Sequence, residues 1–201
     1  KKPAAPDANP PTLPHMDFAN EALLKVLRGE MPVMLTAHRL SDIQTALRLA
    51  EEFSFRLILH GATDAHLFAD ELSTRMIPVV YGPIRSAERS MERMRHTPET
   101  PAILEKAGVK VALVADDAGM YGPEAARELP LDAAFAFKNG MSEDSALRAI
   151  TISPAEMLGV ADRLGSIEAG KDADLVILSG HPFKLKSLPE TTLVNGKVVW
   201  P

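Results

Sequence analysis

The chain has 201 residues, of which 46% are hydrophobic and 24% are charged, a composition typical of a soluble globular protein with one substantial core. Its net charge of −5 and its scattered basic residues argue against nucleic acid or an anionic membrane as the main partner. The absence of cysteine excludes disulfides, thiolate metal ligands and a cysteine nucleophile. Because no apolar run approaches the ~20 residues of a membrane span and no signal peptide is visible, we expect a soluble protein, cytoplasmic rather than exported.

The first segment, residues 1–16, is rich in proline, which fixes the backbone φ angle and removes hydrogen-bond donors. We predict that it forms a linker or an extended arm. A helix is expected to follow from Asp17, a suitable N-cap, to Leu27. The chain opens without methionine, so we expect it to be a piece of a longer protein.

Short apolar runs alternate with amphipathic segments over the next ninety residues. Strands are predicted at Val33–Ala37, Phe55–Leu59, Met76–Tyr81 and Val109–Ala115, and helices at Ser41–Phe53, Thr63–Ser73 and Pro101–Ala107. This alternation is typical of βα units and predicts a parallel sheet. The arginine-rich stretch Gly82–Pro101 interrupts it and is interpreted as a functional or mobile loop or, more simply, as a solvated helix over Ala87–Met94.

The last third of the chain changes character twice. Helices are predicted at Pro123–Lys138, Ser142–Ile150 and Ser153–Leu158. A strand follows at Asp174–Leu178, and then a hairpin over Thr192–Trp200, whose Asn195-Gly196 pair favours a type I′ turn. We expect these tail strands to form a small β element separate from the parallel sheet.

Polar residues at strand ends are the first candidates for function, since ligands gather at the carboxyl ends of parallel strands. Asp116 and Asp117 end the fourth predicted strand, and His60 follows the second. Each has a simpler interpretation: either aspartate as a helix or turn cap, and His60 as a hydrogen-bond partner of a loop carbonyl. Arg39 is a candidate contact for a substrate carboxylate, because a guanidinium binds carboxylates in a bidentate manner, although a structural salt bridge is as plausible.

Two segments resemble a known family. The run Leu-Gly-Ser-Ile-Glu-Ala-Gly-Lys-Asp-Ala-Asp-Leu-Val-Ile-Leu over 164–178, followed by Val-Asn-Gly-Lys-Val-Val over 194–199, resembles the closing β-sandwich signature of the amidohydrolase superfamily. Residues 151–160 resemble the last barrel helix, and residues 37–43, 59–61 and 107–112 resemble the imidazolonepropionase-related and prolidase-like subgroup. The resemblance implies an α/β fold: 17–160 as the C-terminal half of a (β/α)8 barrel, strands five to eight, and 161–201 as a sandwich segment.

The resemblance also implies a site. Asp116 matches the strand-eight aspartate, which is a catalytic base and a metal ligand, and His60 matches the strand-six metal ligand. Thr36 stands where the family usually has a histidine, and His38 is the candidate substitute ligand. The implied cofactor is Zn²⁺ or a similar divalent metal in an intact relative. Whether this chain also binds the metal depends on the effect of having Thr36 at the usual histidine position.

The preferred hypothesis is therefore a metal-dependent hydrolase of C–N bonds in amides, cyclic amides or dipeptides, present here as a C-terminal fragment that is inactive alone. One alternative is a non-catalytic amidohydrolase-like protein whose degenerate site binds a small ligand or partner. Another is a doubly wound α/β binding module whose two aspartates hold Mg²⁺. Because four strands cannot close a barrel, the expected partner is the N-terminal half or a second copy.

Overall fold

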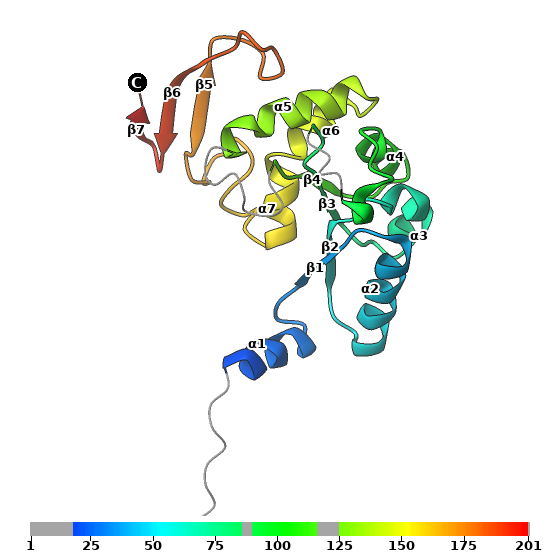
Figure 1. The fold of residues 1–201 in the computed structure, drawn as a ribbon. Helices are drawn as coiled ribbons and strands as arrows, with labels where there is room; N and C mark the ends of the chain where they lie inside the picture. The colour runs from blue at the N-terminus through cyan, green and yellow to red at the C-terminus, as the bar shows by residue number, and fades with distance from the viewer. Residues whose placement is uncertain (1–17, 86–89, 116–124, 201) are drawn as a thin grey trace, which may run out of the picture.

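The central element is an open sheet of four parallel strands. The computed structural model describes residues 18–85, 90–115 and 125–200, and it places the strands in the order β1-β2-β3-β4 (Figure 1). The strands are β1 (Val33–Ala37), β2 (Leu57–Gly61), β3 (Val79–Tyr81) and β4 (Val111–Leu113). Each strand pairs with the one before it, so the sheet runs in one direction without the reversal of order that defines a doubly wound fold. The doubly wound alternative is therefore wrong, and the described strands form no closed barrel.

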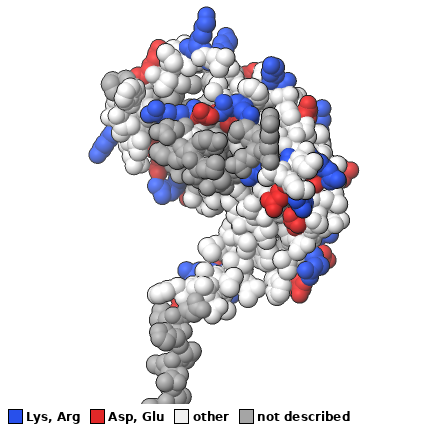
Figure 2. All heavy atoms as spheres, in the orientation of Figure 1, with Lys and Arg blue, Asp and Glu red and all other residues white. Residues whose placement is uncertain are grey.

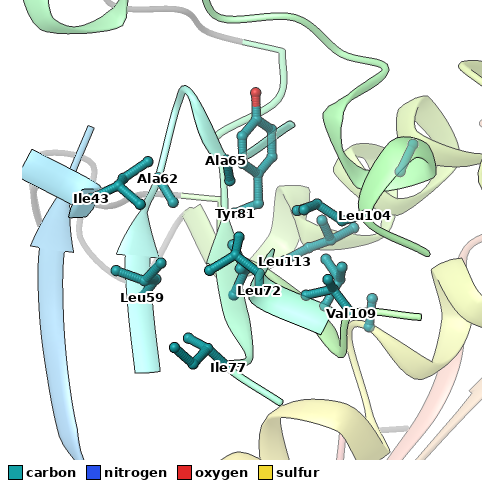
Figure 3. Close-up of a cluster of buried hydrophobic side chains, with 14 of the residues drawn as sticks. Ile43, Leu59, Ala62, Ala65, Leu72, Ile77, Tyr81, Leu104, Val109 and Leu113 are labelled. Carbon is teal, nitrogen blue, oxygen red and sulfur yellow. The ribbon is translucent and has the colours of Figure 1, made fainter. Parts of the chain in front are cut away.

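Helices cover one face of this sheet and enclose the main core. They are α2 (Leu40–Phe53), the 3₁₀ turn η1 (Ala65–Phe68), α3 (Ala69–Thr74), α4 (Thr100–Lys106), α5 (Ala125–Lys138) and α6 (Glu143–Arg148). Alternate strand residues such as Leu59, Val79 and Leu113 point into this layer and meet Ile43, Leu72 and Leu104 from the helices (Figure 3). Burying such side chains stabilises the fold by about 1.5–3 kcal/mol each.

The opposite face of the sheet, called the inner face below, carries the other half of the strand residues. Thr36, His60, Val80 and Ala112 are paired across the four strands and therefore lie in one row. Helix α7 (Ile152–Leu158) packs on this face through Met157, which forms a small cluster with Ile58 and Ala112. The row is thus covered by α7 at its β4 end and carries Thr36 and His60 at its β1 end.

Several boundaries differ from the sequence predictions. Strand β2 begins two residues later than expected and runs to Gly61, because Val33 of β1 pairs with Leu57, so His60 lies inside the strand instead of after it. The helix expected at Thr63–Ser73 is divided between η1 and α3. Of the helix expected over Ala87–Met94, the described residues 90–94 contain the 3₁₀ turn η2 (Met91–Arg93), and residues 86–89 lie outside the described part.

The predicted small β element of the tail is a separate three-stranded antiparallel sheet, with β5 (Leu175–Leu178), β6 (Pro189–Val194) and β7 (Lys197–Trp200) in that order. Asn195 and Gly196 have φ values of 50° and 72°, as a type I′ hairpin turn requires. The segment before β6 joins the tail to the helical layer: His181 Nε2 lies 2.8 Å from Glu143 Oε1 of α6, and Phe183 stacks on Phe137 of α5.

Helix α1 (Phe18–Leu27) precedes β1 and extends away from the rest of the chain (Figure 1). Val26 is its one buried residue. In the part of the chain that the structure describes, no helix has both the length and the apolar character needed to cross a membrane. The expected arm at residues 1–16 lies outside the described residues.

Candidate active site

Thr36 and His60 come together at the carboxyl end of the inner face. Their Cα atoms are paired between β1 and β2, and the Thr36 hydroxyl lies 3.1 Å from Nδ1 of the His60 imidazole. The strand alternation places both side chains on the same face of the sheet. The two positions that the sequence singled out are therefore neighbours, and one hydrogen bond links them.

His38 lies just beyond β1, buried among polar partners. Its Nδ1 is 2.9 Å from the Thr63 hydroxyl, and its Nε2 is 3.4 Å from a terminal nitrogen of Arg93. A guanidinium can only donate hydrogen bonds, so Nε2 accepts and Nδ1 carries the proton that is donated to Thr63. Both imidazole nitrogens of His38 are thus engaged by protein groups, as expected of a residue that shapes the loop.

The end of β2 approaches this histidine closely. Gly61 has a φ of +76°, and a Cβ atom at this position would lie 2.4 Å from Cε1 of His38. Only glycine can adopt this left-handed backbone without placing a side chain where the imidazole of His38 lies. Gly61 therefore fixes the distance between the end of β2 and the loop after β1.

Asp64 is the third polar residue that organises this end of the sheet. Its buried carboxylate accepts a hydrogen bond from the backbone N–H of Leu40 at the start of α2, and its Oδ2 lies 3.1 Å from a guanidinium nitrogen of Arg95. Arg93 and Arg95 belong to the segment after β3. This segment therefore crosses over the carboxyl ends of β1 and β2, where it contacts both His38 and Asp64.

The start of the same segment is held by Asp132 of α5. The Asp132 carboxylate is fully buried and accepts hydrogen bonds from the backbone N–H groups of Ile84 and Arg85 at 3.2 Å each. The Arg85 Nε atom lies 3.3 Å from it. Burial raises the pKa of the Asp132 carboxyl, and the guanidinium of Arg85 acts in the opposite direction.

His96 belongs to the same segment and stacks on Tyr81 of β3, with ring centroids 5.8 Å apart. Burial lowers its pKa, and its Nε2 has no hydrogen-bond partner among the described residues. His96 is thus half-buried, with its ring against Tyr81. Tyr81 donates a hydrogen bond from its hydroxyl to the carbonyl of Thr97, which holds the far end of the same segment.

The remaining predicted site residues fall in two groups. Arg39 is exposed, stands at the N-cap of α2 directly after His38, and has no ion-pair partner within the described residues. Asp116 and Asp117 lie outside the described part of the chain.

Sequence reasoning missed Thr63, Asp64, Arg93 and Arg95. Thr63 and Asp64 were recognisable as polar residues just after a strand, but the folding of the arginine-rich segment over them was not.

The described residues do not on their own fit a zinc site. No group of three or more histidine, aspartate or glutamate side chains converges within them. The row at the carboxyl end of the inner face supplies one imidazole, His60, beside a hydroxyl that is a poor zinc ligand. Any metal site here would need ligands beyond those that the structure describes.

Fold and site together define an open parallel βα sheet whose polar residues gather at the carboxyl ends of its strands. The family model of the amidohydrolase family matches residues 33–199, which is most of the chain. The protein therefore belongs to the amidohydrolase family. This agrees with the resemblance found in the sequence.

The relatives that this chain matches are longer than the chain itself. It is 40% identical to an amidohydrolase from Thermotoga maritima of known crystal structure, with a TM-score of 0.87 over 94% of this chain and 48% of that one. It is 28% identical over 184 residues to the amidohydrolase tasK of Hapsidospora irregularis, covering 90% of this chain and 18% of that protein. It is also 32% identical to an N-substituted formamide deformylase of Arthrobacter pascens, over 72% of this chain and 28% of that protein. The chain spans less than half the length of each.

Proposed function

We propose that the chain forms part of a metal-dependent hydrolase that cleaves C–N bonds in small molecules, in amides, cyclic amides or dipeptides. The observation that carries this proposal is the position of His60, at the carboxyl end of the inner face in a chain that belongs to the amidohydrolase family. The names of the relatives are consistent with it, since one is a deformylase of N-substituted formamides and others are deacetylases of N-acetylglucosamine 6-phosphate.

In this proposal Asp116 is both a metal ligand and the catalytic base, as the family resemblance implies. Asp116 accepts the proton of the water that attacks the carbonyl carbon, and His60 polarises the carbonyl oxygen or binds the metal. Arg39, exposed beside His38, binds a carboxylate of the substrate with its two parallel N–H groups. His38, the candidate substitute ligand, holds the loop between β1 and α2 through Thr63 and Arg93. The metal, Zn²⁺ or a similar divalent ion, takes its remaining ligands from outside the described residues.

The test uses this chain together with the part of the Thermotoga maritima amidohydrolase that lies outside the match. The mixture, supplied with zinc, is assayed against N-formyl amines, small lactams and dipeptides. We expect hydrolysis that falls at least 100-fold in Asp116→Asn and in His60→Ala. Arg39→Ala should raise KM for substrates with a carboxylate and leave kcat nearly unchanged.

A matched control is Arg48→Ala, which removes an exposed arginine of α2 that is paired with Glu52, away from the strand ends. It should leave both kcat and KM unchanged. If the two parts form a complex that hydrolyses none of these substrates, or one in which Asp116→Asn equals the wild type, the proposal is wrong.

One observation favours a second function. Thr36 occupies the family's usual histidine position and its hydroxyl is bonded to Nδ1 of His60. A site with this pair suits a non-catalytic protein that binds a small ligand without cleaving it. Binding of a substrate analogue in the absence of zinc and without turnover would support this alternative over the hydrolase.

A further inference from the structure

A cavity of about 720 Å³ opens at the amino ends of the parallel strands. Its lining includes residues that precede or begin three of them, Pro32 for β1, Leu57 for β2 and Pro78 for β3. His60 lies near the other end of β2 and does not line it. The volume is in the range of about 300–1,000 Å³ that is typical of small-molecule sites. The cavity is therefore large enough for a ligand and separate from the candidate active site.

The floor of the cavity is apolar and already packed. Leu47 of α2, Leu72 of α3 and Val109 before β4 line it, and all three are buried in the main core. Ile58 and Met157 also line it, and they belong to the small cluster with α7. Figure 2 shows few charged side chains on the surface between α1 and α2, the helices that precede β1 and β2. Because core packing already holds these side chains, binding an apolar group here does not require them to be ordered first.

The rim of the cavity carries three basic and two acidic side chains: Arg56, Arg75, Lys110, Glu51 and Glu156. Two of the cations are neutralised within the chain, since Arg75 lies 3.2 Å from Glu51 and the Lys110 ammonium lies 2.6 Å from Glu156. The side chain of Arg56 is exposed and makes no ion pair or hydrogen bond within the described residues. Arg56 is therefore the cation at the rim whose charge is left for an external anion.

Two other cavities lack this excess of positive charge. A cavity of about 640 Å³ between α3 and α4 is lined by Lys106 together with Asp70 and Glu71, so acidic side chains outnumber basic ones there. A smaller cavity, of about 290 Å³, has two basic and two acidic side chains in its lining. Of these three cavities, the one at the amino ends of the strands combines an apolar floor with an unbalanced cation.

We infer that this cavity binds a small amphipathic carboxylate, with its aliphatic body on the apolar floor and its carboxylate paired with Arg56. A guanidinium binds a carboxylate through two parallel N–H groups, which fixes the orientation of the ligand. A neutral ligand would leave Arg56 unpaired, and a second negative charge would gain little, because Arg75 and Lys110 already have partners. The ligand is an effector that binds away from the candidate active site, so the inference does not depend on hydrolysis.

The experiment titrates the full chain with sodium octanoate and with octan-1-ol, which share a chain length and differ in charge. Isothermal titration calorimetry measures both. We expect one octanoate per chain, bound about three- to fivefold more tightly than octan-1-ol, the size expected of an ion pair at an exposed rim. Arg56→Gln should abolish this preference and leave the affinity for octan-1-ol unchanged. Arg48→Gln is the matched control, since Arg48 is an exposed arginine of α2 that pairs with Glu52 and does not line the cavity.

Two further variants fill the cavity from different helices. Ala50→Phe of α2 and Ser73→Leu of α3 each place a larger side chain in the lining and should weaken the binding of both ligands at least fivefold. Circular dichroism verifies that each variant folds as the wild type does. Because the two positions are on separate helices, loss of folding in one variant leaves the other to test the site.

Three results would overturn the inference: octanoate that does not bind or binds at many equivalent sites, an Arg56→Gln chain that still prefers octanoate to octan-1-ol, or folded cavity-filling variants that bind as tightly as the wild type. A chain that dimerises through this region, and so excludes octanoate, would count as absence of binding. Failure of the proposed function reads differently, since octanoate would then bind this chain while none of the tested amides is hydrolysed.

Discussion

Thr36 and His60 occupy paired positions on two neighbouring parallel strands, and the Thr36 hydroxyl lies 3.1 Å from Nδ1 of His60. Neighbouring strands are about 4.8 Å apart, a separation from which two side chains can reach one ligand. The pair therefore presents one imidazole and one hydroxyl side by side, and both could reach one ligand in the proposed hydrolase.

Replacing Thr36 by histidine should place a second imidazole beside His60. We expect the Thr36→His chain to bind zinc at least tenfold more tightly than the wild type, because Zn²⁺ prefers imidazole to a neutral hydroxyl. Isothermal titration with zinc chloride measures the change directly. Thr36→Val serves as the control, since it removes the hydroxyl and adds no ligand. Equal zinc affinity of the Thr36→His and Thr36→Val chains would contradict this view of the pair.

The close approach of Gly61 to His38 gives a second prediction, on stability. Gly61→Ala forces a left-handed alanine, at a cost of about 1–2 kcal/mol, and also pushes its Cβ into the imidazole 2.4 Å away. Overpacking of this kind costs a further 1–3 kcal/mol or so. Gly29→Ala is the matched control, because Gly29 has a similar φ of +73° and no atom within 4 Å of its added Cβ. Urea unfolding of the two variants should show Gly61→Ala as the less stable, and equal losses would disprove the steric role of His38.

Local patterns predicted most of the fold. The apolar runs at Val33–Ala37 and Val109–Ala115 and the Asn195-Gly196 turn depend on neighbouring residues alone, and the structure has strands and a hairpin there. The start of β2 was not predictable in this way. It depends on the pairing of Val33 with Leu57, which is a contact between distant segments.

The candidate site was harder to predict from the sequence, because it too depends on contacts between distant segments. His60 was identified from its place near a strand end and from the family resemblance. The contacts of His38 with Thr63 and Arg93 join residues 25 and 55 positions apart, and no local pattern specifies them. The arginine-rich segment was recognised as a long loop of interest, but its course across β1 and β2 is set by the anchors Asp64 and Asp132.

Asp132 provides a prediction about this segment. Asp132→Ala leaves two backbone N–H groups and the Arg85 side chain without their buried acceptor, which should cost about 3 kcal/mol of stability, near the low end for a broken buried pair because Arg85 is partly exposed. Glu128→Ala removes the other, exposed partner of the same arginine and should cost less than about 1 kcal/mol. Denaturant unfolding at neutral pH compares them. If Glu128→Ala loses as much stability as Asp132→Ala, then Asp132 is not the residue that anchors this segment.

His96 makes stability depend on pH. Burial holds the pKa of its imidazole below the ordinary value of 6.5, so the unfolded chain takes up this proton more readily than the folded chain. The stability that neutral His96 contributes is present above pH 6.5 and is lost as the pH falls through the lower pKa of the folded state. Each unit of difference between the two pKa values corresponds to about 1.4 kcal/mol.

The variant His96→Phe keeps the aromatic stack on Tyr81 and removes the titrating group. We therefore expect the fall in Tm between pH 7.5 and pH 5 to be smaller in His96→Phe than in the wild type, as measured by circular dichroism. Tyr81→Phe is the control, because it deletes the hydroxyl that donates to Thr97 and leaves His96 in place, so its Tm should fall with pH as steeply as that of the wild type. If Tm falls by the same amount in His96→Phe and in the wild type over this range, the proton responsible for the acid sensitivity binds elsewhere in the chain.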